Sequence, residues 1–240
     1  MIESKNNQII SFTRKLLQKK YRKESGLYLV EGRKLVEEAI RLNLVEYIVT
    51  SSQTQIQFDK VYTVADNVFS TLTDTINSQG VIAVVKMPTN DLCVPQSSCL
   101  ILEKIQDAGN LGTIMRTAVA TGYNDIFLID CVDAYSPKVI RSASSAHFFT
   151  HIYSVDLETV YSLLHSTHKF ICADMKGENI FNYTQSIPLH ALIIGNEGNG
   201  ISDKARQLSD LTLSLPMKNN LESLNAGVSA GVLMYILSNK

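Results

Sequence analysis

The sequence lacks the features that would place it among membrane or secreted proteins. Its longest apolar run, GVLMYIL near the C-terminus, is far too short to cross a bilayer, and the polar N-terminus has no apolar core of the signal-peptide type. The formal net charge is −1, so the chain as a whole has no electrostatic preference for nucleic acid. We find no internal repeat and no low-complexity segment. These absences predict a cytoplasmic globular protein without a membrane anchor.

Cysteine is scarce, and its spacing has no recognisable pattern. The four cysteines, Cys93, Cys99, Cys131 and Cys172, are far apart, without a Cys-x-x-Cys pair, and the five histidines are scattered. This arrangement favours neither a disulfide framework nor a structural zinc site. We therefore expect free thiols in a reducing compartment, histidines that are structural or on the surface, and no bound metal.

Positive charge is concentrated in a single segment. Residues 1–23 contain seven basic side chains and one acidic side chain, Glu3. Such a segment can neutralise phosphates, but it can equally be the solvated face of a helix, and charge alone does not separate the two interpretations. The candidate RNA-binding residues here are Arg14, Lys15, Lys19, Lys20, Arg22 and Lys23.

Proline divides the chain. Residues 88–98 hold two of the five prolines and follow no clear hydrophobic period, which is typical of a linker. Before them, the pattern predicts helices over 4–23, 31–43 and 65–74 and strands over 27–30, 45–51, 60–64 and 80–87. We predict a small α/β domain over residues 1–88, a linker over 89–98 and a second domain over 99–240.

Residues 99–240 alternate regularly between apolar strands and helical stretches. Apolar strands are predicted over 99–105, 125–130, 150–155, 169–175, 191–195 and 211–216, with helical stretches between most of them. Alternating strands and helices predict a parallel sheet with helices on both faces. Ligands of such sheets bind beyond the carboxyl ends of the strands. Three unusual segments follow such ends, after the first, fifth and sixth strands, so we expect them to form one site.

The first of these segments is AGNLGTIMR. We predict Asn110 as the N-cap of the helix that follows, and an apolar stripe of Leu111, Ile114, Met115, Ala118 and Val119. Arg116 lies off that stripe, near the positive end of the helix, where a cation is misplaced unless an anion compensates it. A plain cap and a surface arginine would explain the segment too. The spacing Gly109-x-x-Gly112 is not a dinucleotide-binding fingerprint.

The other two segments combine glycines with polar residues. In IIGNEGNGIS, glycines surround Glu197 at a strand end, where they permit a tight turn and close approach of a ligand. In LPMKNNLESLNAGVSAGVLMYIL we predict a helix that begins at Glu222 or Ser223, with Ser223 as N-cap and Asn225 in the first turn. The rest of that helix is almost wholly apolar, which indicates a dimer interface or very tight packing.

Together the three segments resemble the signature motifs of a known enzyme family. NLGTIMR, GNEGNGIS and LPMKNNLESLNAGVSAG are similar, over roughly residues 99–240, to the SpoU (TrmH) family of RNA ribose 2′-O-methyltransferases in the SPOUT superfamily. The first part, with YLVEGRKLVEEAI, more loosely resembles the substrate-binding domain of rRNA-modifying members. The resemblance implies a parallel sheet with a deep C-terminal trefoil knot, bound S-adenosylmethionine, a homodimer and an RNA substrate.

The resemblance also implies site residues. The implied catalytic residues are Asn110, Arg116, Glu197, Ser223 and Asn225, and the implied cofactor-binding residues are Gly195, Leu215 and Leu224. Two positions depart from the family pattern: Ser145, where relatives commonly carry glycine, and Ala226-Gly227, where larger residues are usual. The end at Lys240, without the extension of tRNA-acting relatives, favours rRNA.

Several alternatives stay open at this level. The RNA could be tRNA, or the chain could be a catalytically silent RNA-binding protein of the same fold or a nucleotide-dependent enzyme with an ordinary doubly wound sheet. The resemblance implies Arg116 as base, but arginine hardly titrates in proteins, so a grip on the phosphate beside the target ribose fits better. The sequence identifies neither the target nucleotide nor its base, and it leaves an antibiotic-resistance role open.

Overall fold

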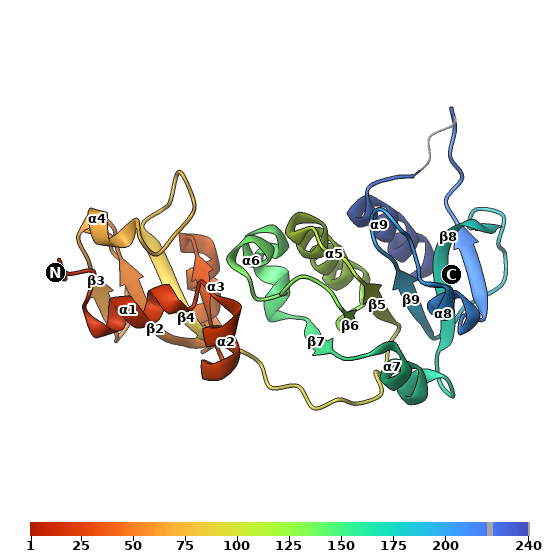
Figure 1. Cartoon of the computed structure of the whole chain (residues 1–240), viewed down its shortest axis with the longest axis horizontal. Coiled ribbons are helices and arrows are strands. Elements are labelled where there is room, and N and C mark those ends of the chain that lie inside the picture. Colours follow the sequence, from red (N-terminus) through yellow and green to blue (C-terminus); the bar gives the residue numbers. More distant parts are fainter. Residues whose placement is uncertain (220–222, 240) are drawn as a thin grey trace. The chain divides into compact units, whose positions relative to one another are not determined.

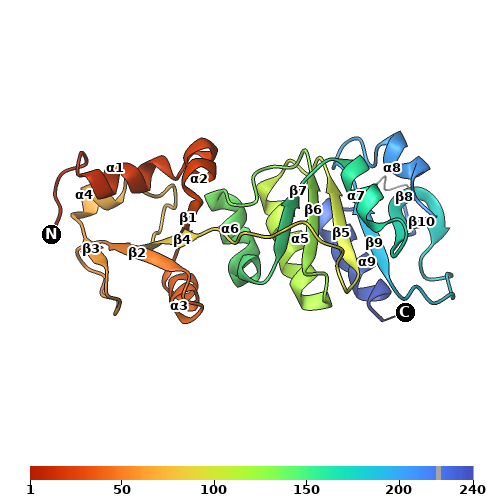
Figure 2. The same ribbon diagram turned by 90° about the horizontal axis from the view of Figure 1, so that it is seen from below.

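The protein is represented by a computed structural model that describes residues 1–219 and 223–239. The chain forms two compact units. The first unit consists of Met1–Thr89 with Tyr135–Phe148, and the second of Asn90–Ala134 with Phe149–Lys240. Figures 1 and 2 show the elements of each unit.

The first unit is built on a four-stranded mixed sheet. Its elements are α1 (Gln8–Lys15), α2 (Lys19–Ser25), β1 (Leu27–Glu31), α3 (Arg33–Arg41), β2 (Val45–Thr50), β3 (Val61–Thr63), α4 (Asp66–Phe69), β4 (Val81–Lys86), α6 (Pro137–Ala143) and the 3₁₀ helix η1 (Ser144–Phe148). The strand order is β1-β4-β2-β3, with β1 and β2 antiparallel to β4, and β3 parallel to β2. All four strands predicted in this part are confirmed.

Both faces of this sheet are covered. Alternation along β1 sends Leu29 to the face packed against Ile10 of α1, and Tyr28 to the face packed against Val36 of α3. Ile140 of α6 joins the second of these clusters. For this reason residues 135–148 group with the first unit, although the sequence places them in the second domain. A local pattern shows that a helix has an apolar face, but it does not show which sheet that face covers.

The prediction of one continuous helix over 4–23 is wrong. The structure has two helices, α1 and α2, because Gln18 adopts an extended conformation between them (φ −101°, ψ 134°). The buried Arg22 side chain donates from Nη1 to the Leu16 carbonyl at 2.7 Å, which satisfies a backbone group released by the break. The predicted helix over 65–74 is likewise shorter, since α4 ends at Phe69.

The second unit contains a six-stranded sheet with only parallel pairs. Its elements are β5 (Cys99–Glu103), α5 (Ala108–Thr121), β6 (Asp125–Ile129), β7 (His151–Ser154), α7 (Leu157–Leu164), β8 (Lys169–Asn179), β9 (His190–Ile194), α8 (Asp203–Gln207), β10 (Leu211–Ser214) and α9 (Ala226–Leu237). The strand order is β10-β8-β9-β5-β6-β7. The predicted parallel sheet and its six strands are confirmed.

Helices cover both faces of this sheet, as predicted. On one face, α7 and α8 pack on a cluster that includes Phe127 and Ile193. On the other face, α5 and α9 lie side by side (Figure 1). The chain leaves β5 in one direction for β6 and β7, whereas β9, β8 and β10 lie in the other direction. The strand order therefore reverses between β5 and β9, and the carboxyl ends of these two strands are where such folds bind ligands.

Membrane spans and metal clusters are both missing from the described residues. No helix in the described part of the chain combines the length and apolarity needed to cross a bilayer. Within residues 1–219 and 223–239, no group of three His, Cys, Asp or Glu side chains is arranged to hold a metal ion. Three histidines are buried, and burial lowers the pKa of two of them, His147 and His190, to about 4.

Candidate active site

Asn110 connects the three loops at the carboxyl ends of the strands. Its Nδ2 donates to Glu197 Oε1 at 3.0 Å, and its Oδ1 accepts from Asn225 Nδ2 at 2.8 Å. One amide thus joins the start of α5, the loop after β9 and the start of α9. The sequence prediction that these segments form one site agrees with this arrangement.

The loop after β9 is closed by its own backbone. Asn196 and Gly200 exchange two backbone hydrogen bonds of 2.9 Å, and the Asn196 side chain accepts from the N–H groups of Gly198 and Asn199. A Cβ at Gly195 would lie 2.3 Å from the carbonyl carbon of Gly200, so only glycine fits there. The closed loop holds Glu197 at the surface, beside α5.

Neighbouring hydrogen-bond donors lower the pKa of the Glu197 carboxyl. Partial burial pushes its pKa up, but hydrogen bonds from the Asn110 side chain and from the backbone N–H of Asp107 outweigh burial and hold the pKa below its usual value. Glu197 is therefore ionised at neutral pH. Asn196 Nδ2 donates to its Oε2 over a long 3.4 Å, and a carboxylate oxygen can accept a further hydrogen bond from a substrate donor.

Two predicted helix caps are wrong. Asp107, not Asn110, caps α5, because its carboxylate accepts from the Asn110 N–H at 2.8 Å while Asn110 is already helical. Asn225, not Ser223, caps α9, where its Oδ1 accepts from the N–H groups of Gly227 and Val228. The other predicted start of that helix, Glu222, lies outside the described residues.

Arg116 is exposed in the third turn of α5, as the ninth of its 14 residues, so it does not lie at the positive end of the helix as predicted. Among the described residues, no ion pair or hydrogen bond of its guanidinium is found. Arg116 lies one turn beyond Thr113 on α5. Thr113 faces Gly227 of α9, since a Cβ placed at Gly227 would lie 3.3 Å from the Thr113 side chain. The Arg116 side chain therefore leaves α5 near the contact between α5 and α9. Within the described residues, this cation therefore has no anionic partner.

The remaining predicted site residues lie at the rim. Ser223 is exposed, two residues before the cap of α9, and makes no hydrogen bond with another described residue. Leu215 is half-buried just after β10, and Leu224 is 37% exposed. The structure therefore brings Asn110, Glu197 and Asn225 into direct contact, but within residues 1–219 and 223–239 it shows no such contact for Arg116, Ser223, Leu215 or Leu224.

The sequence analysis did not single out Asp107 or Asn196. Asp107 caps α5 and donates its backbone N–H to Glu197 at 3.4 Å, and Asn196 Nδ2 donates to the Lys104 carbonyl at 2.8 Å. The signal for Asp107 was available, because an aspartate three residues before Asn110 is an ordinary capping position. No local signal reveals the contact of Asn196 with the Lys104 carbonyl, since Lys104 follows a different strand, β5.

The basic segment of the first unit is only partly a surface feature. Lys15, Lys19, Lys20 and Lys23 are exposed and Arg14 is half-buried, while the ammonium groups of Lys15 and Lys20 lie 5.4 and 5.9 Å from the centre of the Tyr21 ring. Arg22 is 3% exposed and bound to the Leu16 carbonyl. Arg22 is therefore removed from the predicted RNA-binding set, because a buried guanidinium cannot reach a phosphate.

Comparisons with known proteins agree with this arrangement. Residues 97–235 match the model of the SpoU rRNA Methylase family, and residues 7–83 match that of the MRM3-like substrate binding domain. The chain is 34% identical, over 98% of each sequence, to the 23S rRNA (guanosine(2553)-2′-O)-methyltransferase RlmP of Bacillus subtilis.

A second curated relative and a solved structure are similar as well. The 23S rRNA (uridine(2479)-2′-O)-methyltransferase of Streptomyces viridochromogenes is 30% identical over 65% of this chain and 58% of its own length. The crystal structure of an AdoMet-bound rRNA methyltransferase from Sinorhizobium meliloti superposes with a TM-score of 0.87 at 25% identity, over 99% of this chain and 97% of that chain.

Proposed function

The chain belongs to the SpoU rRNA methylase family, and on that premise we propose that it transfers a methyl group from S-adenosylmethionine to a ribose 2′-hydroxyl in rRNA. The observation that carries the proposal is the hydrogen-bonded chain Glu197–Asn110–Asn225, because it holds the three motif loops together. The two curated relatives act on a guanosine and on a uridine, so membership of the family does not assign the target base.

The segments after β9 and β10 suit S-adenosylmethionine. Leu215 and Leu224 offer partly exposed apolar side chains, and in the described part of the chain neither donates its backbone N–H to another backbone group. Apolar side chains beside free amides match a ligand with an apolar ring face and a polar ring edge. With Gly195, these residues would hold the cofactor, which supplies an electrophilic methyl group on a sulfonium centre when bound.

Arg116 is proposed to grip the phosphate next to the target ribose and to stabilise the alkoxide that forms at the 2′-oxygen. Its guanidinium is exposed and makes no internal ion pair with a described residue, so it is available to an anionic substrate. A permanently charged arginine suits this task better than that of a base. The anion that pairs with this cation is then in the substrate.

Asn110 and Glu197 serve the site in different ways. Both polar atoms of the Asn110 amide are hydrogen-bonded, one to Glu197 and one to Asn225. Asn110 therefore acts by holding the loops in position relative to one another. Glu197 Oε2 retains acceptor capacity and can receive the ribose hydroxyl or the guanidinium of Arg116. Ser223 and Asn225 would shape the ribose and cofactor pockets from the α9 side.

A homodimer through α9 is part of the proposal. Gly227 and Gly231 face Thr113 and Thr117 of α5 at close range, which explains the small residues on one side of the helix. On another side Val228 is 50% exposed and Tyr235 is 54% exposed, and residues seven apart share a face. Large apolar side chains that are exposed together on one helix support a second copy of the chain as their partner.

The C-terminal path supports the proposed trefoil knot. β10 is at the edge of the sheet, next to β8, yet α9 packs against α5, the helix that follows β5 near the centre of the sheet. The chain must therefore return from an edge to a central position within the residues between β10 and α9. Such a return is the path that a knotted C-terminus needs, although knots are rare in proteins.

The experiment that tests the function is transfer of labelled methyl from S-adenosylmethionine to unmodified 23S rRNA, to tRNA and to the large ribosomal subunit. Arg116→Ala is measured beside Arg41→Ala, an exposed arginine of the first unit that pairs with Glu38. We expect incorporation into rRNA that disappears only with Arg116→Ala and that makes one RNA linkage resistant to alkali.

Other outcomes would replace the proposal. Incorporation into tRNA alone would assign the chain to tRNA modification. RNA binding without incorporation into any of the three substrates would assign it to a catalytically silent RNA-binding protein of the same fold.

A further inference from the structure

Lys104 directly follows β5, at the carboxyl edge of the second sheet. Its backbone has φ 56°, in the left-handed region that residues with a long side chain rarely adopt. The Lys104 N–H donates to the Ile129 carbonyl at 2.8 Å, and the Lys104 carbonyl accepts from Asn196 Nδ2 at 2.8 Å. Bonds to β6 and to the loop after β9 therefore hold this unfavourable conformation in place.

The backbone does not account for a lysine at this position, because glycine would adopt the same angles without the penalty. The neighbouring strand offers a comparison. Asp130 directly follows β6 and has φ 51°, but aspartate tolerates the left-handed region better than lysine does. Residues other than glycine that are held at unfavourable backbone angles gather at functional sites. The reason for a lysine must then lie in its side chain.

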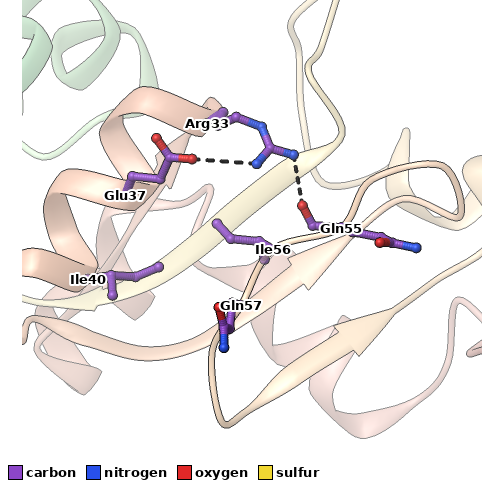
Figure 3. A pocket seen from close by; sticks show the side chains of 6 residues that line it. All are labelled: Arg33, Glu37, Ile40, Gln55, Ile56 and Gln57. Atoms are coloured by element: carbon purple, nitrogen blue, oxygen red, sulfur yellow. Dashed lines mark hydrogen bonds and ion pairs between the residues drawn. The ribbon is translucent and has the colours of Figure 1, made fainter.

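The Lys104 side chain is exposed, and in the described part of the chain its ammonium group forms no ion pair and no hydrogen bond. Several other exposed cations are compensated. Arg33 of the first unit pairs with Glu37, as Figure 3 shows, and Lys204 of α8 pairs with Glu158. The charge of Lys104 is therefore available to an anion from outside the chain.

Two carboxylates adjoin this cation in the chain. Asp130 directly follows Ile129, and Glu197 directly follows Asn196, and these are the two residues that bond to the Lys104 backbone. Hydrogen bonds hold the pKa of Glu197 below its usual value, so this carboxylate is ionised at neutral pH. Carboxylates at this edge of the sheet repel an approaching RNA phosphate, and a cation beside them offsets the repulsion.

We propose that Lys104 binds a phosphate of the RNA substrate, in addition to the phosphate bound by Arg116, and so positions the target nucleotide. Lysine binds phosphate as a point charge, and such contacts fix the position of a nucleic acid without reading its sequence. Asn196 Nδ2 connects the Lys104 carbonyl to the loop after β9. That loop carries Glu197, which bonds to Asn110, so Lys104 adjoins the motif loops. The inference rests on the proposed function, because it assumes that the RNA bound at these loops is the RNA methylated.

The experiment uses the full chain with Lys104→Gly, Lys104→Asn and Lys104→Arg. Glycine and asparagine accept the left-handed backbone but remove the cation, whereas arginine keeps the cation. Lys204→Ala is the matched control, since Lys204 is an exposed lysine of the same unit whose charge is paired with Glu158. The measurements are the KM and kcat of methyl transfer to 23S rRNA, the salt dependence of RNA binding, the affinity for S-adenosylmethionine and the melting temperature.

The two neutral variants, Lys104→Gly and Lys104→Asn, should raise the KM for RNA about tenfold, with a much smaller change in kcat. The slope of log RNA affinity against log salt should fall by about 0.7–0.9, as expected for one lost phosphate contact. Lys104→Arg and Lys204→Ala should keep the normal KM and the normal slope. Lys104→Gly should unfold at a temperature no lower than that of the unsubstituted chain, because glycine relieves the backbone strain.

The salt slope separates this inference from the proposed function. If RNA is methylated but the neutral variants keep the normal KM and slope, the inference is overturned. A normal slope with weakened binding of S-adenosylmethionine would assign the cation to the carboxylate of the cofactor instead. A lower melting temperature in both neutral variants, with no recovery of RNA affinity in Lys104→Arg, would mean that Lys104 has only a structural role. If no RNA is methylated but the slope falls as expected, the proposed function fails and the phosphate assignment stands.

Discussion

Asn225 Nδ2 donates to Asn110 Oδ1 at 2.8 Å, although the two residues are 115 positions apart in the chain. Each asparagine has a second bond that fixes it, Asn110 to Glu197 and Asn225 to the first turn of α9. The pair therefore couples the start of α5 to the start of α9 and, through Glu197, to the loop after β9.

Replacement of Asn110 by alanine should loosen this site and change its pH dependence. Glu197 would lose the side-chain hydrogen bond that lowers its pKa, so the pKa should rise toward its usual value. In the unsubstituted chain, ionised Glu197 contributes to the free energy of unfolding at pH values above its usual pKa. This contribution is lost as the pH falls through the lowered pKa. We expect the acid limb of the rate–pH profile to move to higher pH in the variant. An unchanged acid limb would mean that the ionisation of Glu197 does not control the rate.

Arg116 should be essential to the rate but not to stability. Because its side chain is exposed, Arg116→Ala and Arg116→Lys should change the free energy of unfolding by no more than about 0.5 kcal/mol. Both should lower kcat by roughly 10²-fold or more, since a planar fork of donors is lost from the developing alkoxide. Single-turnover methyl transfer measures this. Arg116→Lys with most of the normal rate would rule out the bidentate role.

Gly195→Ala should open the loop after β9. Its Cβ would lie 2.3 Å from the Gly200 carbonyl carbon, so the backbone must move, at a cost of about 1–3 kcal/mol in the free energy of unfolding. Gly198→Ala is the control, because its Cβ would meet Asn196 Oδ1 at an ordinary 3.5 Å. Calorimetric titration with S-adenosylmethionine should show weakened binding for Gly195→Ala alone. Equal binding by both variants would mean that the affinity for S-adenosylmethionine does not depend on the closed form of this loop.

Neighbouring basic residues of α2 should behave differently. Arg22→Ala leaves the Leu16 carbonyl without its buried donor and should cost about 1–3 kcal/mol in the free energy of unfolding. Lys23→Ala should leave stability unchanged but reduce the slope of log RNA affinity against log salt by about 0.7–0.9, as expected for one lost phosphate contact. Denaturant unfolding and RNA binding at several salt concentrations measure the two effects. A salt slope unaffected by Lys23→Ala would place the RNA elsewhere.

A charge on the exposed face of α9 should dissociate the proposed dimer. Tyr235→Glu puts a carboxylate on a face that would be buried between two copies, where an unpaired charge is costly. Met175→Glu is the control, since Met175 is 63% exposed and belongs to β8, not to α9. Sedimentation velocity should show a monomer for Tyr235→Glu and a dimer for Met175→Glu. A dimer that survives Tyr235→Glu would mean that another surface joins the copies.

The strands were predictable because their apolar pattern is local. All ten strands of the structure lie where the sequence predicts them, and the parallel order of the second unit follows from helices between strands. Helix ends were less predictable. Asp107 and Asn225 cap α5 and α9 in place of Asn110 and Ser223, because several residues near each helix start can accept the same backbone N–H groups and the path of the preceding loop selects one.

The sequence by itself determined the two sheets, the basic segment and the three polar segments that follow strands, since each of these depends on residues close together in the chain. Only the tertiary structure decided that the Asn110 amide lies between Glu197 and Asn225, that Arg22 is buried, and that residues 135–148 cover the first sheet. The physical reason is the same in each case. These outcomes depend on which distant backbone or side chain a polar or apolar group meets, and packing, not local propensity, brings the partners together.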